Sequence, residues 1–199
     1  ARYFAMHGWK DITIAFPSPL HEIEALNKLD TNIRLNILIS NPESVDFFEN
    51  RLTRSIGVYI ELNSGQNRSG IDITDSTSIH EQVKALNTCK QLHLVGFYCH
   101  AGQTYRARSA AEVKEMATTV LNALHHIRET FPGFHFCFGD TPSCSVLRDF
   151  GPVSQISPGN FVFYDLMQVG IGSADYSQIA VLMECPIVEK YPTRNQILI

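Results

Sequence analysis

The chain reads Ser157-Pro158-Gly159-Asn160-Phe161-Val162-Phe163-Tyr164-Asp165 directly after the strand-like residues 153–156, which predicts a strand end that turns through glycine into a tight loop. Glycine tolerates positive φ and has no Cβ, so such a loop lets backbone N–H groups approach an anion closely. Alone, the same letters more often mark an ordinary glycine turn between two strands. Three upstream segments, residues 63–70, 98–105 and 139–143, are also polar and also follow predicted strands. Four such segments in order are typical of the active-site edge of a (β/α) barrel.

Strand-like and helix-like patterns alternate from residue 11 to about residue 164. Alternating or β-branched runs predict strands at 11–16, 34–40, 56–62, 92–98, 134–138 and 153–156. Capping residues predict that helices between them start after Ser18, Asn41, Ser78 and Ser109, and a further short helix is expected over 142–150. This alternation predicts βα units and a parallel sheet.

The pattern changes near residue 173. Residues 179–184, 187–191 and 196–199 are strand-like with no helix between them, which predicts the start of an antiparallel β domain. We therefore divide the chain into a barrel domain, 1–173, and the beginning of a β domain, 174–199. The first eight residues look helical without an initiator Met, and the last four look like a buried strand, so we expect missing residues on both sides.

The composition favours a water-soluble globular protein. Of the 199 residues 44% are apolar, and the formal net charge of −4 argues against nucleic acid as the main partner. No apolar run reaches membrane-spanning length and no signal-peptide pattern is present. The five cysteines are odd in number and form no CxxC pair, so we interpret them as mostly buried, reduced thiols of a cytoplasmic protein.

Three side chains in the polar segments suggest chemistry. Arg68 is a fixed positive charge suited to a phenolate or carboxylate oxygen, although a solvated loop arginine is the plain alternative. His100 could stack on an aromatic ligand, relay a proton or bind metal, but a lone histidine is more often structural. Tyr105 follows at a distance that returns its hydroxyl to the same barrel mouth; its alternative is an ordinary half-buried tyrosine.

Two later segments suggest a phosphate site. Thr141 and Ser143 lie where a strand gives way to a helix N-terminus, which favours a phosphate unless they serve only as caps. Gly159 and Asn160 would add two N–H donors, and two such segments after the last strands match the usual barrel phosphate site. No His, Cys or Asp cluster has metal-ligand spacing, so we expect no metal site within this chain.

Together these motifs resemble the D-serine dehydratase and D-threonine aldolase proteins of the alanine-racemase-like, fold type III, pyridoxal-phosphate enzymes. The likeness rests on Glu61-Leu62-Asn63 with Asn67-Arg68-Ser69-Gly70, on 96–105, on Gly139-Asp140-Thr141-Pro142-Ser143, and on Gly159-Asn160 with Tyr164-Asp165. The resemblance implies a (β/α)8 TIM-type barrel, here incomplete at its N-terminal side, followed by a β domain. It also implies a homodimer, because members are often dimers.

The resemblance assigns roles to six residues. Arg68 would bond the phenolic oxygen of pyridoxal 5'-phosphate and His100 would lie against its ring. Thr141, Gly159 and Asn160 would hold its phosphate, and Tyr105 would face the substrate as the catalytic residue. Ser157 stands where the racemases have an arginine at the pyridine nitrogen, and a serine cannot keep that nitrogen protonated. This difference favours the dehydratase and aldolase branch.

Two features of the family are expected outside this sequence. The Schiff-base lysine belongs on the first barrel strand, before Ala1, and none of the lysines here lies in a matching motif: Lys10, Lys28, Lys84, Lys90, Lys114 and Lys190. Lys10 precedes a strand, where the inactive face of the barrel would be. A divalent metal, zinc or manganese, would be bound by C-terminal ligands beyond Ile199.

The leading hypothesis is a pyridoxal-phosphate-dependent lyase that acts on a small D-amino acid by β-elimination or retro-aldol cleavage. One alternative is an amino-acid racemase. Another is a non-catalytic pyridoxal-phosphate-binding protein, which the absent lysine favours and the strands after residue 173 disfavour. A third is a barrel enzyme for a sugar phosphate, which has no need of Arg68 and His100 together.

Overall fold

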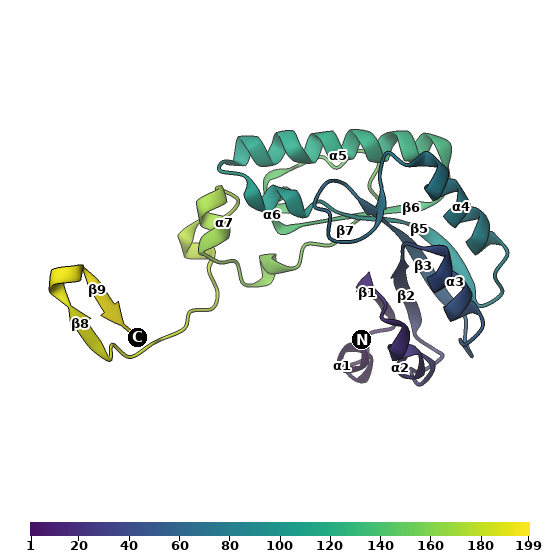
Figure 1. The fold of residues 1–199 in the computed structure, drawn as a ribbon, viewed down its shortest axis with the longest axis horizontal. Helices are drawn as coiled ribbons and strands as arrows, with labels where there is room; N and C mark the ends of the chain where they lie inside the picture. Colours follow the sequence, from purple (N-terminus) through teal and green to yellow (C-terminus); the bar gives the residue numbers. More distant parts are fainter.

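Six strands lie side by side in one parallel sheet, in the order in which they occur along the chain. The computed structural model describes residues 1–199. The strands are β1 (Asp11–Pro17), β2 (Arg34–Ile39), β3 (Ile56–Asn63), β5 (Leu92–His100), β6 (His135–Gly139) and β7 (Gln155–Ile156). A two-residue strand, β4 (Ile71–Asp72), pairs in parallel with the end of β3. The sheet is curved and open (Figure 1), which agrees with the predicted incomplete barrel.

Helices follow the strands and cover the outer face of the sheet (Figure 1). They are α2 (Ile23–Asn27), preceded by a 3-10 turn, η1 (Leu20–Glu22), then α3 (Pro42–Glu49), α4 (Ser76–Asn87), α5 (Ala110–Thr130) and α6 (Thr141–Val146). Alternate strand residues point outward, and the core forms where they meet the apolar stripes of these helices. Ile60, Phe97 and Phe136 are fully buried from the strands, and Phe48 and Leu124 pack from the helices.

The inner face of the sheet carries the other half of each strand. Leu38, Tyr59, Tyr98 and Cys137 form a second, smaller buried cluster there. Toward the carboxyl ends this face becomes polar, because the next inward position along β3 is Glu61 and along β5 is His100. The fold therefore separates an apolar outer core from a polar inner edge.

Two of the four predicted helix caps are confirmed. Asn41 and Ser109 accept hydrogen bonds from the backbone N–H groups of Ser44 and Glu112. The cap predicted at Ser78 is wrong: Asp75 accepts the bond from the Ser78 N–H, so α4 begins at Ser76.

The cap predicted at Ser18 is also wrong. Its N–H donates to the carbonyl oxygen of Leu38, so Ser18 still follows the sheet and makes no cap, and the next turn is 3-10. The short helix expected over 142–150 is observed as α6, which begins one residue earlier after its cap Asp140 and ends at Val146.

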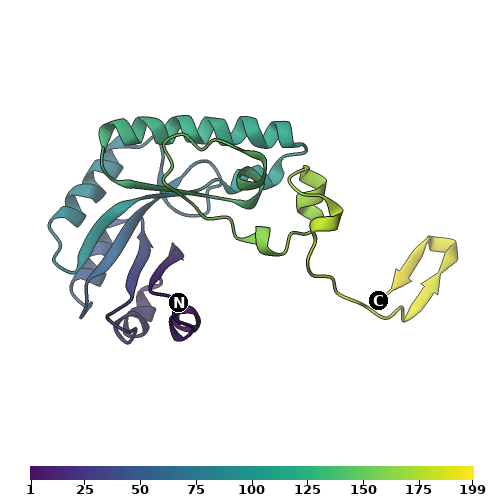
Figure 2. The same cartoon turned by 180° about the vertical axis from the view of Figure 1, so that it is seen from behind.

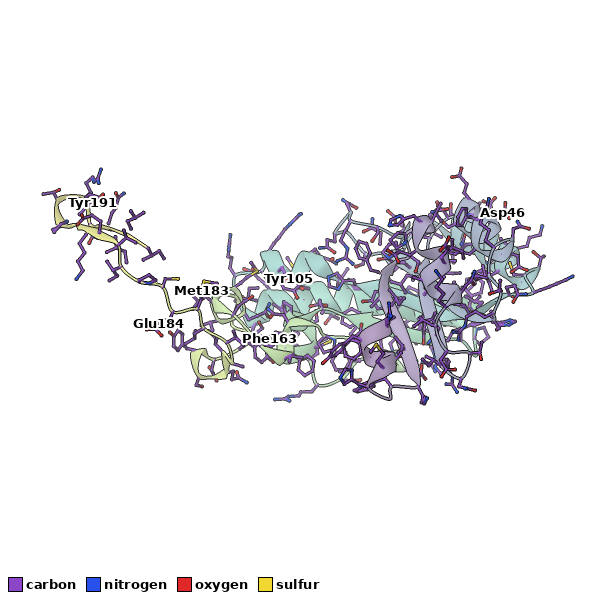
Figure 3. The ribbon with its side chains drawn as sticks, turned by 90° about the horizontal axis from the view of Figure 1, so that it is seen from below. Asp46, Tyr105, Phe163, Met183, Glu184 and Tyr191 are labelled. Carbon is purple, nitrogen blue, oxygen red and sulfur yellow. The ribbon has the colours of Figure 1, made fainter.

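The chain after β7 leaves the sheet through short elements. These are η3 (Asn160–Val162), α7 (Leu166–Ile171), η4 (Tyr176–Gln178), and a hairpin of β8 (Glu189–Tyr191) and β9 (Gln196–Leu198), joined by η5 (Pro192–Arg194). Figures 2 and 3 show the hairpin at the far end of an extended segment that carries Met183 and Glu184. The strand predicted at 179–184 is wrong because these residues have no partner strand; Met183 is 87% exposed.

The antiparallel strands predicted at 187–191 and 196–199 are confirmed as this hairpin. The helix expected in the first eight residues is α1 (Arg2–Met6). All five cysteines are free thiols, two of them buried. None of the helices combines the length and the apolar character that crossing a membrane requires.

Candidate active site

The residues singled out from the sequence gather at one edge of the sheet, the carboxyl ends of its strands. Arg68 lies in the loop after β3, and His100 is the last residue of β5. Tyr105 lies in η2 (Gly102–Arg106), which follows β5, and Thr141 opens α6 directly after β6. Gly159 and Asn160 follow β7. Parallel strands place these ends together, so residues up to 92 positions apart in the chain share one mouth.

Thr141 joins the ends of three strands. Its hydroxyl oxygen accepts a hydrogen bond of 2.9 Å from the backbone N–H of Asn160. Its own backbone N–H donates to the hydroxyl oxygen of Tyr105, with 3.4 Å between nitrogen and oxygen. Thr141 is fully buried and its partners Tyr105 and Asn160 are half-buried, so this link between the loops after β5, β6 and β7 is partly shielded from water.

His100 is held as a neutral imidazole. Burial lowers its pKa to about 4, and the positive charge of Arg68 acts in the same direction, against a hydrogen bond with the Gly139 backbone. Its ring lies 6.4 Å from the ring of Tyr105, at an interplanar angle of 34°. A neutral ring at this edge offers a flat face to an aromatic ligand without adding charge.

Arg68 reaches over the inner face of the sheet. Its guanidinium lies 3.8 Å from the buried carboxylate of Glu61 and 5.6 Å from the centre of the Phe16 ring. The side chain is 39% exposed, so its donors stay open to a ligand. Arg68 thus presents a fixed cation at the edge, as an anionic oxygen requires.

Asp140 holds together the corner between β6 and α6, where the sequence predicts a phosphate site; this role of Asp140 was not predicted. One of its carboxylate oxygens accepts from the Ser143 N–H at 2.7 Å and from the Thr104 hydroxyl at 2.8 Å. Burial raises its pKa to about 6. The signal for it was present: an aspartate directly before Thr-Pro is a typical helix cap.

Glu61 belongs to the motifs that carry the family resemblance, but no role was predicted for it. It interrupts a run of buried apolar residues in β3 and is itself buried. A charged residue inside such a strand is rare unless it is paired, and this signal could have identified it.

Gly159 does not use the positive φ that glycine tolerates. Its φ is −98°, which other residues adopt readily, and it is Tyr164 that takes the left-handed conformation, with φ 50°. A Cβ added at Gly159 would meet no atom within 4 Å. The glycine is required neither by its backbone conformation nor by its protein neighbours, and it leaves open space beside the loop.

Ser157 has only uncharged partners. Its hydroxyl contacts the Tyr98 hydroxyl at 3.4 Å and the Cys137 thiol at 3.5 Å. Burial raises the pKa of Tyr98 to about 12, so this hydroxyl stays protonated. The inner end of the site therefore carries no cation at the position where the resemblance placed the racemase arginine.

Two hollows in the surface differ in their relation to these residues. One of about 440 Å³ adjoins the loop after β7 and is lined in part by Ser157, Pro158 and Tyr164. A larger one of about 730 Å³ lies between α1 and α2 and contains none of the candidate residues. No group of three His, Cys, Asp or Glu side chains in the chain is arranged to hold a metal ion.

The family model described as the N-terminal domain of alanine racemase matches residues 6–163. The chain belongs to this family.

Proteins similar to this family member include lyases. A D-serine dehydratase from Dictyostelium discoideum is 26% identical over 98% of this chain and 54% of its own length. An alanine-racemase-like protein from Idiomarina loihiensis superposes with a TM-score of 0.79 at 26% identity, over 90% of this chain and 49% of the other. A D-threonine aldolase from Filomicrobium marinum, 18% identical, shares the fold with a TM-score of 0.76, over 92% of this chain and 51% of the other. The chain spans about half the length of the curated relatives that it matches.

Proposed function

We propose that this chain forms the cofactor-binding part of a pyridoxal-phosphate-dependent lyase that acts on a D-amino acid by β-elimination or retro-aldol cleavage. The observation that carries the proposal is the single edge on which Arg68, His100 and the Thr141–Asn160 pair meet. Membership of the alanine racemase family and the similarity to a D-serine dehydratase along almost the whole chain support it.

The residues present fit pyridoxal 5'-phosphate. A methyl group added at Gly159 would meet no protein atom within 4 Å, so a phosphate oxygen can approach the backbone there. The Ser143 hydroxyl is buried at the same corner without a hydrogen-bond partner. A buried polar atom without a partner costs free energy, and a bound phosphate would supply one.

Each residue would have a distinct task around the cofactor. Arg68 would bond the phenolic oxygen, and the neutral His100 would lie against the ring. The Thr141 hydroxyl and the backbone N–H of Gly159 would hold the phosphate, and the Asn160 N–H, which already donates to the Thr141 oxygen, would fix that hydroxyl in place. The cofactor supplies an electron sink for the negative charge that develops on the substrate.

Ser157 supports lyase chemistry over racemization. Its neighbours are the neutral hydroxyl of Tyr98 and the thiol of Cys137, and neither can keep a pyridine nitrogen protonated. The absence of a cation at this position matches the dehydratase and aldolase branch and departs from the racemase pattern.

Tyr105 would face the substrate. Its hydroxyl lies at the edge beside the Thr141 N–H and the ring of His100. From there it could hold a proton near the substrate hydroxyl that departs.

The test is a product assay with the purified protein and pyridoxal phosphate. D-Serine should give pyruvate and ammonia. D-Threonine distinguishes the two reactions, because β-elimination gives 2-oxobutyrate whereas retro-aldol cleavage gives glycine and acetaldehyde. L-Serine is the control, and Tyr105→Phe should reduce turnover of the D-amino acid while leaving cofactor binding in place. Interconversion of D- and L-alanine without any keto acid or aldehyde would contradict the lyase assignment and favour a racemase.

Further parts of the proposal concern the whole protein. We propose a barrel domain over 1–173 and a second domain that begins at 174, a homodimer, a cytoplasmic location, and a divalent metal bound by residues outside this sequence. Chelation followed by add-back of zinc or manganese tests the metal, and light scattering tests the dimer.

A further inference from the structure

Glu61 is a buried carboxylate on the inner face of β3, beside the proposed cofactor site. Only 2% of its side chain is exposed. One oxygen, Oε1, accepts a hydrogen bond of 2.8 Å from the Ser69 hydroxyl and lies 3.8 Å from Nη2 of Arg68. The other oxygen, Oε2, is buried and has no partner.

The loop that carries Arg68 folds back onto its own strand. The Asn63 side-chain oxygen accepts from the N–H groups of Gly65 and Asn67, and β4 then pairs with the last residues of β3. Gly70 lies so close to this strand that an added Cβ would come within 2.8 Å of the Asn63 nitrogen. This fold returns Arg68 and Ser69 together to the carboxylate of Glu61.

A buried, incompletely satisfied carboxylate is unfavourable for folding alone. Burial raises the pKa of Glu61, and the Ser69 hydroxyl and the Arg68 charge only partly oppose this. Apolar residues fill the outward positions on either side of it in β3, so the strand does not need a carboxylate for packing. The cation that pairs with it is Arg68, which projects from the loop after β3.

We propose that Glu61 is a positioning residue for Arg68. Its carboxylate holds the guanidinium over the inner face, at the place where Arg68 meets the phenolic oxygen of the cofactor ring. This inference rests on the proposed function for the identity of that ring. The alternative is a purely structural Glu61 that does no more than tie Ser69 to the strand.

The experiment is a double-mutant cycle on binding of pyridoxine 5'-phosphate, measured by calorimetry with the purified protein. This compound keeps the phenolic oxygen and the phosphate but has no aldehyde, so its binding needs neither a lysine nor turnover. Glu61→Gln should weaken binding about tenfold, because Arg68 then loses the carboxylate charge that lies 3.8 Å from its guanidinium. In the Arg68→Met background the same change should have an effect below about twofold.

Two controls separate positioning from structure. Glu61→Asp, which keeps the charge, should recover part of the affinity. Glu49→Gln is the matched control, because Glu49 accepts backbone N–H groups from Lys90, Gln91 and Leu92 far from the site; it should lower the melting temperature without changing affinity.

Equal losses of affinity from Glu61→Gln with and without Arg68 would overturn the inference, as would unchanged affinity. A protein that binds pyridoxine phosphate and shows the coupling, yet turns over no D-amino acid, would support the inference and contradict the proposed reaction.

Discussion

The hydroxyl oxygen of Thr141 and the backbone N–H of Asn160 are joined by a hydrogen bond of 2.9 Å, which ties the end of β6 to the loop after β7. This bond fixes the Thr141 hydroxyl, a proposed phosphate ligand, beside the loop that carries Gly159 before any anion arrives. It also means that the Thr141 hydroxyl acts as an acceptor toward the protein and keeps its own proton for a ligand.

Thr141→Val should therefore reduce the free energy of phosphate binding more than it reduces the free energy of unfolding. The loss of one acceptor should cost about 1 kcal/mol of unfolding free energy, measured by urea denaturation. Affinity for pyridoxine phosphate should fall about tenfold, because the variant lacks the hydroxyl that would donate to the phosphate. Thr141→Ser keeps the hydroxyl and should bind nearly as the parent does; equal losses in both variants would contradict the prediction.

The raised pKa of Asp140 predicts that the stability of the fold depends on pH. Its pKa is raised from 3.8 to about 6 by burial, so between these values the folded protein holds a proton that the unfolded chain has released. Stability should then fall as pH rises through this window, by at most about 1.4 kcal/mol per pH unit.

The variant Asp140→Asn keeps an oxygen for Thr104 and for the Ser143 N–H while removing the titration. Urea denaturation of both proteins at pH 4.5, 6 and 8 checks the prediction. The difference in unfolding free energy between variant and parent should grow in favour of the variant up to about pH 6 and then level off. A constant difference at all three pH values would show that Asp140 does not titrate there.

His100 should remain neutral throughout the physiological range. Its pKa is lowered to about 4, so its ring resonances should not shift between pH 5.5 and 8 in an NMR titration. Because its lowered pKa makes the folded state bind fewer protons than the unfolded chain, its contribution to stability is lost as pH falls from 6.5 toward about 4.

Arg68→Met should raise the pKa of His100 only in part, since burial is the larger cause and the charge of Arg68 the smaller. A His100 signal that titrates near 6.5 in the parent protein would contradict the neutral-ring description.

Gly159→Ala should leave the fold intact and impair the site. Gly159 has φ −98° and an added methyl group meets no protein atom within 4 Å, so unfolding free energy should change by less than about 0.5 kcal/mol. Affinity for pyridoxine phosphate should still drop, because the methyl group enters the space assigned to the phosphate.

Gly70→Ala is the contrasting variant. Its φ is 99° and its added Cβ would meet the backbone of β3, so it should destabilise the protein by about 1 kcal/mol or more. A Gly159→Ala protein that is as destabilised as Gly70→Ala, or that binds the ligand normally, would count against an open phosphate cradle at Gly159.

The division of the chain near residue 173 is tested by truncation. Every residue of β8 and β9 is exposed, and one hydrogen bond, from the Ala180 N–H to the Phe163 carbonyl, ties the extended segment to the residue that follows η3. A chain that ends at Ser173 should unfold with the same urea midpoint as the longer chain. A clear drop in that midpoint would place residues after 173 in the barrel domain.

The sequence by itself determined the alternation of strands and helices and the edge on which the polar segments gather. Apolar periodicity and caps such as Asn41 and Ser109 are local features, so they can be read before any distance is known. Where a nearby residue competed for the same role, as Asp75 did with Ser78, the local pattern misplaced the helix start.

Tertiary structure alone decided which of the polar residues act on one another. Thr104 and Asp140 are 36 positions apart, and their hydrogen bond exists only because β5 and β6 are adjacent and in register. The same packing buries Glu61 beside Arg68, makes His100 neutral and leaves open space where a Cβ of residue 159 would lie. The physical reason is that burial and distance set pKa values and partners, and both arise only when the parallel strands align and the sheet curves.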